Sequence, residues 1–311
     1  MAHRSLFVAA FALAASPALA QTARIATTPA VDPHAGHMMM EQAPAAAAKP
    51  DNPAIPPDNA ASADRLKNSP RHGEWVDIKM PSGAPLKSFV VYPERKDKAP
   101  VVLVIHDIHG MGDWGRAVGD QLAKEGFIAI VPDFLSGKGP NGGGSEELGQ
   151  GVGQAIRALT PDDMAARLNA AMAYGKSLPA SNRKTAVIGF CWGGSASLNY
   201  AIAQPDLNAS VVYYGTPPMK TVDGAQVVDP APLEKIKAPI IGFYGGNDAR
   251  VTSTVEPTAA EMKKLGKSYE SHVMEGAGHG FLKGQASSEA NGKAAADAWP
   301  LTIAFLKKNT Q

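Results

Sequence analysis

The chain has 311 residues, 44% of them hydrophobic, which suits one large or two ordinary domains with a buried core. Its 30 basic and 29 acidic residues give a formal net charge of +1, and no basic stripe points to a nucleic acid partner. The single cysteine, Cys191, excludes an internal disulfide, so the fold must depend on its core.

Residues 1–20 have the three parts of a secretory signal peptide. Arg4 gives a basic start, residues 6–15 are apolar, and residues 18–20 form a small-residue ending. Cleavage is expected before Gln21, which predicts a periplasmic or secreted protein. The apolar run is too short for a transmembrane helix, and no later stretch is long enough, so no membrane contact is expected after signal removal.

Residues 21–71 are rich in alanine and proline and hold almost no large apolar side chains. Such a segment cannot bury enough surface to offset its ordering entropy, so we expect a disordered tail outside the fold. His34 and His37 lie there beside three methionines, and imidazole with thioether groups suits copper. They are a weak metal candidate, because flexible tails rarely preform a site; no metal is expected in the domain.

Strand and helix patterns alternate along residues 72–311, the expected domain. Strands are expected within residues 74–83, 86–94, 99–107, 127–133, 184–190, 208–215, 238–246 and 268–275. Helices are expected within residues 112–127, 161–178, 192–204, 254–266 and 291–308. The alternation predicts an α/β fold with a mostly parallel central sheet and helices on both faces. Residues 136–157 form a long Gly-rich connection, and connections of that length often serve as lids.

The segment Gly189-Phe190-Cys191-Trp192-Gly193 lies where an expected buried strand meets the next helix. In that context the pattern predicts a nucleophile elbow, a sharp turn that needs glycine two residues either side of the nucleophile. It would place the sulfur at a helix N-terminus, which favours a thiolate. The alternative is a buried structural cysteine.

A nucleophile on such an elbow needs a base, expected late in the chain. Two histidines follow Cys191. His272 lies inside an expected strand, whereas His279 lies between glycines in the loop after it. Loops at strand ends carry catalytic groups, so we predict His279 as the base.

The acid is expected between the nucleophile and the histidine in sequence. Asp248 directly follows a buried strand, so we predict that it orients the imidazole of the base. Asp223 and Asp229 also lie in this interval, but neither directly follows a buried strand. The two oxyanion donors are expected to be the backbone N–H groups of Trp192 and, from the loop after residues 99–107, Ile108.

Five motifs in order, "HDIHG", "EGFIAIVPD", "GFCWGG", "YGGNDARV" and "GAGHGF", resemble those of the dienelactone hydrolase family, cysteine-containing members of the α/β-hydrolase fold. The resemblance covers about residues 73–309. It implies a triad of Cys191, Asp248 and His279 that hydrolyses an enol-lactone or ester through an acyl-enzyme. The implied partner is a small-molecule lactone or ester, and no cofactor is needed.

The resemblance also implies that an acidic residue keeps the resting thiol neutral, a position held here by Asp107. The family typically has glutamate there, one methylene longer. Where the family binds the substrate carboxylate with arginines, the nearest cations here are Lys138 and Lys283. A lysine is a point charge and not a planar fork, so a lactone or ester with looser anion recognition is expected.

Two alternatives remain open at this stage. One is a general carboxylesterase or thioesterase with the same chemistry. The other is a periplasmic metal-handling module in which the His34 and His37 cluster binds metal and the hydrolase domain is idle. The sequence does not indicate the oligomeric state or the exact substrate.

Overall fold

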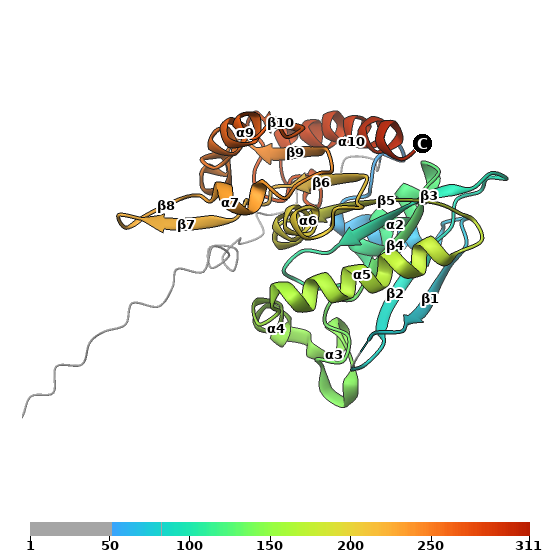
Figure 1. Ribbon diagram of the computed structural model, residues 1–311. Coiled ribbons are helices and arrows are strands. Elements are labelled where there is room, and N and C mark those ends of the chain that lie inside the picture. Colours follow the sequence, from blue (N-terminus) through green and yellow to red (C-terminus); the bar gives the residue numbers. More distant parts are fainter. Residues whose placement is uncertain (1–51, 82) are drawn as a thin grey trace, which may run out of the picture. The chain divides into compact units, whose positions relative to one another are not determined.

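The computed structural model describes residues 52–81 and 83–311. An eight-stranded sheet runs through this part of the chain in the spatial order β1-β2-β4-β3-β5-β6-β9-β10 (Figure 1). In this sheet β2 is antiparallel to both its neighbours, and the other neighbouring pairs are parallel, which confirms the predicted mostly parallel sheet. Its strands are β1 (Gly73–Ile78), β2 (Leu86–Val91), β3 (Ala99–Ile105), β4 (Ile128–Pro132), β5 (Ser181–Phe190), β6 (Ala209–Tyr213), β9 (Ile240–Gly245) and β10 (Tyr269–Met274).

Helices cover both faces of this sheet, as predicted (Figure 1). One apolar cluster joins α2 and α10 to one face, and a second joins α5, α6 and α9 to the other. The longer helices are α2 (Asp113–Lys124), α5 (Pro161–Ser177), α6 (Trp192–Ala203), α9 (Val255–Lys264) and α10 (Glu289–Thr310). None of the helices in the described part of the chain has the length and apolar character needed to span a bilayer.

Local sequence signals explain where the central elements begin and end. All seven residues of β3 are buried, as expected for a strand covered on both faces. The helix α5 begins after Thr160, whose side chain accepts a hydrogen bond from the backbone N–H of Asp163, with Pro161 at the first position.

Residues 52–71, which we call the N-terminal strap, pack onto the domain. The expectation of a disordered tail up to residue 71 is therefore wrong for this segment. Ile55 is only 3% exposed and joins the apolar cluster of α2. Trp114 of α2 donates its indole N–H to the carbonyl of Pro57 at 3.0 Å. The strap also contains the short helix α1 (Ser62–Lys67).

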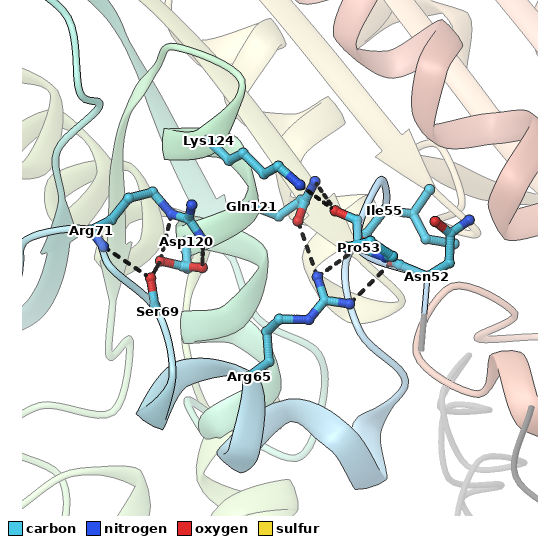
Figure 2. A network of polar contacts seen from close by, with 9 residues as sticks. All are labelled: Asn52, Pro53, Ile55, Arg65, Ser69, Arg71, Asp120, Gln121 and Lys124. Carbon is cyan, nitrogen blue, oxygen red and sulfur yellow. Dashed lines mark hydrogen bonds and ion pairs between the residues drawn. The ribbon is translucent and has the colours of Figure 1, made fainter. Parts of the chain in front are cut away.

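Polar contacts to the strap's backbone order this segment (Figure 2). They explain why the strap is ordered although its amino-acid composition predicted disorder. The guanidinium of Arg65 donates to the carbonyls of Asn52 and Ile55, at 3.1 and 3.2 Å. At the other end of the strap, Arg71 forms an ion pair with Asp120 of α2. A segment with few large apolar side chains is thus ordered by hydrogen bonds to its carbonyl groups.

The strap also contacts the loop after β10. The backbone N–H of Asn59 donates to the carbonyl of Lys283 at 2.9 Å, and the side chain of Gln285 donates to the carbonyl of Pro56 at 2.8 Å. The loop that carries His279 is therefore in hydrogen-bond contact with a segment more than 200 positions earlier in the chain.

The region between β6 and β9 contains a hairpin that the sequence did not predict. Its strands are β7 (Met219–Val222) and β8 (Ala225–Val228), a separate two-stranded sheet that projects beyond the main one (Figure 1). Asp223 lies at its exposed tip, and the short helix α7 (Pro230–Leu233) follows.

The long connection over residues 136–157 contains two short helices, α3 (Ser145–Leu148) and α4 (Val152–Arg157). Val152 and Ile156 are buried in the same apolar cluster as Ile108 and Cys191. The connection is thus packed against the loop after β3. The signal-peptide and metal expectations, with His34 and His37, concern residues 1–51 and lie outside the described residues.

Candidate active site

The predicted site residues follow the carboxyl ends of parallel strands. Asp107 and Ile108 come after β3, Cys191 after β5, Asp248 after β9 and His279 after β10. The carboxyl ends of parallel strands share one edge of a sheet, where ligands bind in open α/β folds. The topology therefore collects these residues, which are far apart in the sequence, at a single edge.

The turn at Cys191 has the geometry of a nucleophile elbow. Its φ of 57° and ψ of −117° lie outside the regions that most residues adopt. A Cβ on Gly189 would lie 1.9 Å from the carbonyl oxygen of Gly193, and a Cβ on Gly193 would lie 2.4 Å from that of His106. Both glycines are therefore required by close backbone contacts, which agrees with the predicted need for glycine.

Asp248 and His279 form a hydrogen-bonded pair. Nδ1 of His279 lies 2.5 Å from Oδ2 of Asp248, and both side chains are largely buried. Burial alone would raise the pKa of the Asp248 carboxyl, but the contact with His279 and the nearby charge of Arg250 bring this pKa below its usual range. The carboxylate is therefore ionised at neutral pH and can fix the orientation of the imidazole.

The other sequence candidates for base and acid lie elsewhere. Asp229 caps α7 and lies 3.6 Å from Lys220, and Asp223 is at the hairpin tip. His272, on the edge strand β10, contacts Glu270 at 2.7 Å. Of the candidates, the structure brings Asp248 and His279 together.

Cys191 is only 7% exposed, and the ionisation of its thiol reflects opposed influences. Burial, followed by the negative charge of Asp107, raises the pKa of the thiol to about 12. The backbone N–H groups of Trp192 and Ile108 interact with the sulfur and lower this pKa. The resting thiol is therefore protonated at neutral pH, so the helix N-terminus alone does not produce the thiolate expected from the sequence.

Trp192 and Ile108, the two predicted oxyanion donors, are thus both directed at the nucleophile. Trp192 is the first residue of α6, and its ring stacks on the buried imidazole of His106 at 5.8 Å between centroids. Nε2 of His106 accepts the backbone N–H of Phe134 at 3.3 Å, and burial lowers the pKa of His106. His106 is consequently a neutral structural group packed against the ring of Trp192.

Asp107 and Lys283 form an ion pair beside the nucleophile, with 2.6 Å between Nζ and Oδ2. The other carboxylate oxygen of Asp107 accepts the backbone N–H of His109 at 2.8 Å. Burial would raise the pKa of Asp107, but His109 and Lys283 bring it well below its usual range. The ammonium predicted to bind substrate is therefore occupied by an internal carboxylate.

Lys138, the second predicted substrate-binding cation, lies exposed on the loop after β4. Hydrogen bonds from Thr160 lower the pKa of Asp163, in the first turn of α5, and the charge of Lys138 adds a smaller effect in the same direction. The formal charges that act most on the sulfur of Cys191 are those of Asp107 and Arg250, and Lys138 is not among them.

Two residues near the nucleophile were not predicted from the sequence. Arg250, in the short helix α8 (Ala249–Thr252), lowers the pKa values of both Cys191 and Asp248 by its positive charge. Tyr214 directly follows β6, and its ring packs on that of His279 at 5.1 Å between centroids. The signal that could have found both was their position just beyond buried strands, the same signal that identified Asp248.

In residues 52–81 and 83–311 no group of three or more His, Cys, Asp or Glu side chains is placed to hold a metal ion.

The sheet with its antiparallel β2, the elbow after β5, and the acid and histidine on later loops define an α/β-hydrolase fold. A comparison with protein families agrees: residues 86–310 match the model of the dienelactone hydrolase family. The chain belongs to this family and is a hydrolase of the carboxylic ester class.

Individual relatives and a solved structure support the same family. A protein of Methylorubrum extorquens named as a proposed carboxymethylenebutenolidase is 27% identical over 211 residues, which cover 66% of this chain and 71% of that protein. Protein usf of Aquifex pyrophilus is 30% identical over 242 residues, with 76% of this chain and 98% of the relative covered. A proposed dienelactone hydrolase from Klebsiella pneumoniae has a similar fold, with a TM-score of 0.66 at 23% identity, over 76% of this chain and 98% of that structure.

Proposed function

We propose that this protein hydrolyses a lactone or ester through a Cys191-His279-Asp248 triad and a thioester intermediate. The observation that carries this proposal is the hydrogen bond between Asp248 and His279 at the same sheet edge as a cysteine elbow. This combination supplies a nucleophile, a base and a group that orients the base.

The reaction begins with the thiol of Cys191. Its proton passes to Nε2 of His279, and the thiolate attacks the carbonyl carbon. The carbonyl electron pair moves to the oxygen, which the N–H groups of Trp192 and Ile108 stabilise. One such donor contributes about 3–4 kcal/mol to the stability of the transition state.

Two further steps complete the cycle. The tetrahedral intermediate collapses to a thioester on Cys191, and the leaving alkoxide or enolate takes the proton from His279. A water molecule then gives a proton to His279 and attacks the thioester. Sulfur leaves, recovers the proton from His279, and the carboxylic acid is released.

The charges around the sulfur bear on the substrate. Lys283 forms an ion pair with Asp107 at 2.6 Å, so its charge is shared with an internal carboxylate and is not a dedicated clamp for a substrate carboxylate. This favours a lactone or ester substrate that does not need such a clamp. General carboxylesterase or thioesterase activity is compatible with this arrangement. The ratio of kcat/KM between enol-lactones and simple aryl esters separates these two substrate classes.

Site variants with a matched control test the triad. We expect Cys191→Ala and His279→Gln to lose at least about 10³-fold in kcat/KM for an activated ester. His272→Gln is the control, because this second histidine contacts Glu270 on the edge strand. Hydrolysis by Cys191→Ala at the parent rate would show that Cys191 is not the nucleophile and would contradict the proposed function.

We also propose that the protein is exported and acts in the periplasm or outside the cell. The tripartite pattern of residues 1–20 supports this location. N-terminal sequencing of protein from a periplasmic or culture fraction should begin at Gln21, and an intact Met1 in a purely cytosolic fraction would contradict the proposal.

A further inference from the structure

The hydroxyl group of Tyr214 is a buried polar group that the reaction above does not use. Tyr214 is 2% exposed, and its oxygen has no hydrogen-bond partner among residues 52–81 and 83–311. A buried hydroxyl without a partner costs about 1–3 kcal/mol, so its retention beside a reactive sulfur needs an explanation.

The sheet register places Tyr214 beside the nucleophile. Phe190 at the end of β5 is paired with Tyr213 at the end of β6, so Cys191 and Tyr214 occupy the next positions along the two strands. The backbone N–H of Cys191 donates to the carbonyl of Tyr213 at 3.0 Å. The hydroxyl of Tyr214 is near enough to Cys191 and Asp107 to be affected by the negative charge of each.

The backbone of Tyr214 is held in an unusual conformation. Its φ is 42°, in the left-handed region that a bulky residue rarely adopts. Its N–H donates to the carbonyl of Phe243 at 2.8 Å, and its ring packs edge-on against His279 and Phe281. Strained backbone of this kind is typical of functional sites, and here it occurs at the residue whose ring packs against His279.

We propose that the Tyr214 hydroxyl is a built-in hydrogen-bond donor for the Cys191 thiolate, and that it stabilises the charged nucleophile in preference to the resting thiol. When the proton of Cys191 moves to His279, the sulfur becomes a charged acceptor and the unpaired O–H gains a partner. No bond of the tyrosine breaks, and its own proton remains on the oxygen.

The chemistry of the site suits this role. Burial, together with the charges of Asp107 and Cys191, raises the pKa of Tyr214 well above its usual value, so the group is a neutral donor at every working pH. A hydrogen bond to a charged acceptor is stronger than one to a neutral acceptor. Because the hydroxyl gains its partner only in the charged state, it lowers the barrier to that state.

The test is Tyr214→Phe, which removes the hydroxyl and keeps the ring against His279. Cys191 is the only cysteine, so alkylation by iodoacetamide reports on this sulfur alone. We expect the pH profile of alkylation to shift by about one unit to higher pH, and kcat/KM for an activated ester to fall about 10–100-fold. The midpoint of thermal unfolding should stay the same or rise, because a buried polar group without a partner is removed.

The other groups that act on the sulfur or on this tyrosine stay unchanged in the experiment. They are Asp107 after β3, Tyr213 in β6, Arg250 in α8 and His279 after β10.

Tyr213→Phe is the matched control. Its hydroxyl contacts Thr302 in α10 at 2.7 Å, so the loss of that hydrogen bond should lower the unfolding midpoint and leave the alkylation profile unchanged. An alkylation profile of Tyr214→Phe that superimposes on the parent's would overturn the inference. A loss of stability in Tyr214→Phe as large as in the control would also overturn it, because the hydroxyl would then have a resting partner.

This inference rests on the proposed role of Cys191, and the two can fail separately. Alkylation needs no substrate and no turnover. If Cys191→Ala keeps its esterase activity, the proposed function fails whatever the tyrosine does. If that variant is inactive and Tyr214→Phe alkylates like the parent, only the inference fails.

Discussion

At the scale of single residues, the charge of Asp107 dominates the polar surroundings of the nucleophile. This carboxylate raises the pKa of the Cys191 thiol, second only to burial itself. Lys283 lies 2.6 Å from the same carboxylate, on the loop that carries His279. The lysine therefore partly neutralises the negative charge that keeps the thiol protonated, and it couples the base loop to the nucleophile.

Opposite charge changes at this ion pair should shift the pKa of the Cys191 thiol in opposite directions. Asp107→Asn removes a negative charge, which lowers the pKa of Cys191 and should make alkylation at pH 7 about tenfold faster for each unit of decrease. Lys283→Met leaves the carboxylate unpaired, which raises the pKa and should make alkylation slower. The rates are measured by mass spectrometry after iodoacetamide treatment at several pH values.

The two variants control for one another, because both disrupt the same contact. If alkylation changed in the same direction in both, loss of the ion pair itself, and not the charge at the sulfur, would be the cause. That result would contradict the electrostatic account.

Residue patterns predicted part of this site. The spacing around Cys191 and the position of Asp248 and His279 after buried strands depend on local sequence, and the hydrogen bond between acid and histidine agrees with them. The pairing of Asp107 with Lys283 spans 176 positions and has no local signal. Only the sheet topology brings the two groups into contact. The sequence therefore predicted Lys283 as a substrate-binding residue and gave no sign of its ion pair with Asp107.

At the scale of elements, the N-terminal strap is the least expected part of the fold. It bridges α2 and the loop after β10, through Ile55 on one side and the contact from Asn59 to Lys283 on the other. Composition could not predict it, since hydrogen bonds to its carbonyls hold the strap, both from Arg65 within it and from Lys124 and Gln285 far along the chain. The strap therefore supports both the stability of the domain and the position of the base loop.

Truncation of one buried side chain tests the contribution of the strap. Ile55→Ala should lower the free energy of unfolding by about 2–5 kcal/mol, because the side chain is 3% exposed. Val273→Ala, at a residue 53% exposed on β10, is the control and should change it by less than about 0.5 kcal/mol. Urea denaturation measures both, and equal midpoints for the two variants would show that the strap does not stabilise the domain.

The hairpin of β7 and β8 was missed for a different reason. Three of the four residues in β8 are exposed, as are three in β7, so neither strand has the apolar pattern that identifies buried strands. The buried strands of the main sheet, such as β3 and β4, have near-continuous apolar sequences, which is why their positions could be predicted.

At the scale of the whole molecule, one mostly parallel sheet brings loops from five strands to a common edge. The proposed nucleophile, base, acid and oxyanion donors, together with Tyr214, all follow strand ends, although they span the chain from Ile108 to His279. The fold thereby assembles in space a site that no single segment contains. In the proposed reaction the sulfur of Cys191 carries the acyl group during turnover.

Intact-mass spectrometry of the acid-quenched protein tests that claim most directly. After brief mixing with an activated ester, we expect a protein whose mass is increased by one acyl group, with the modification on the peptide that contains Cys191. Cys191→Ala should show no such increase. An acyl group on another residue, or steady turnover by the parent with no trapped acyl-enzyme and full activity in Cys191→Ala, would show that Cys191 is not the nucleophile.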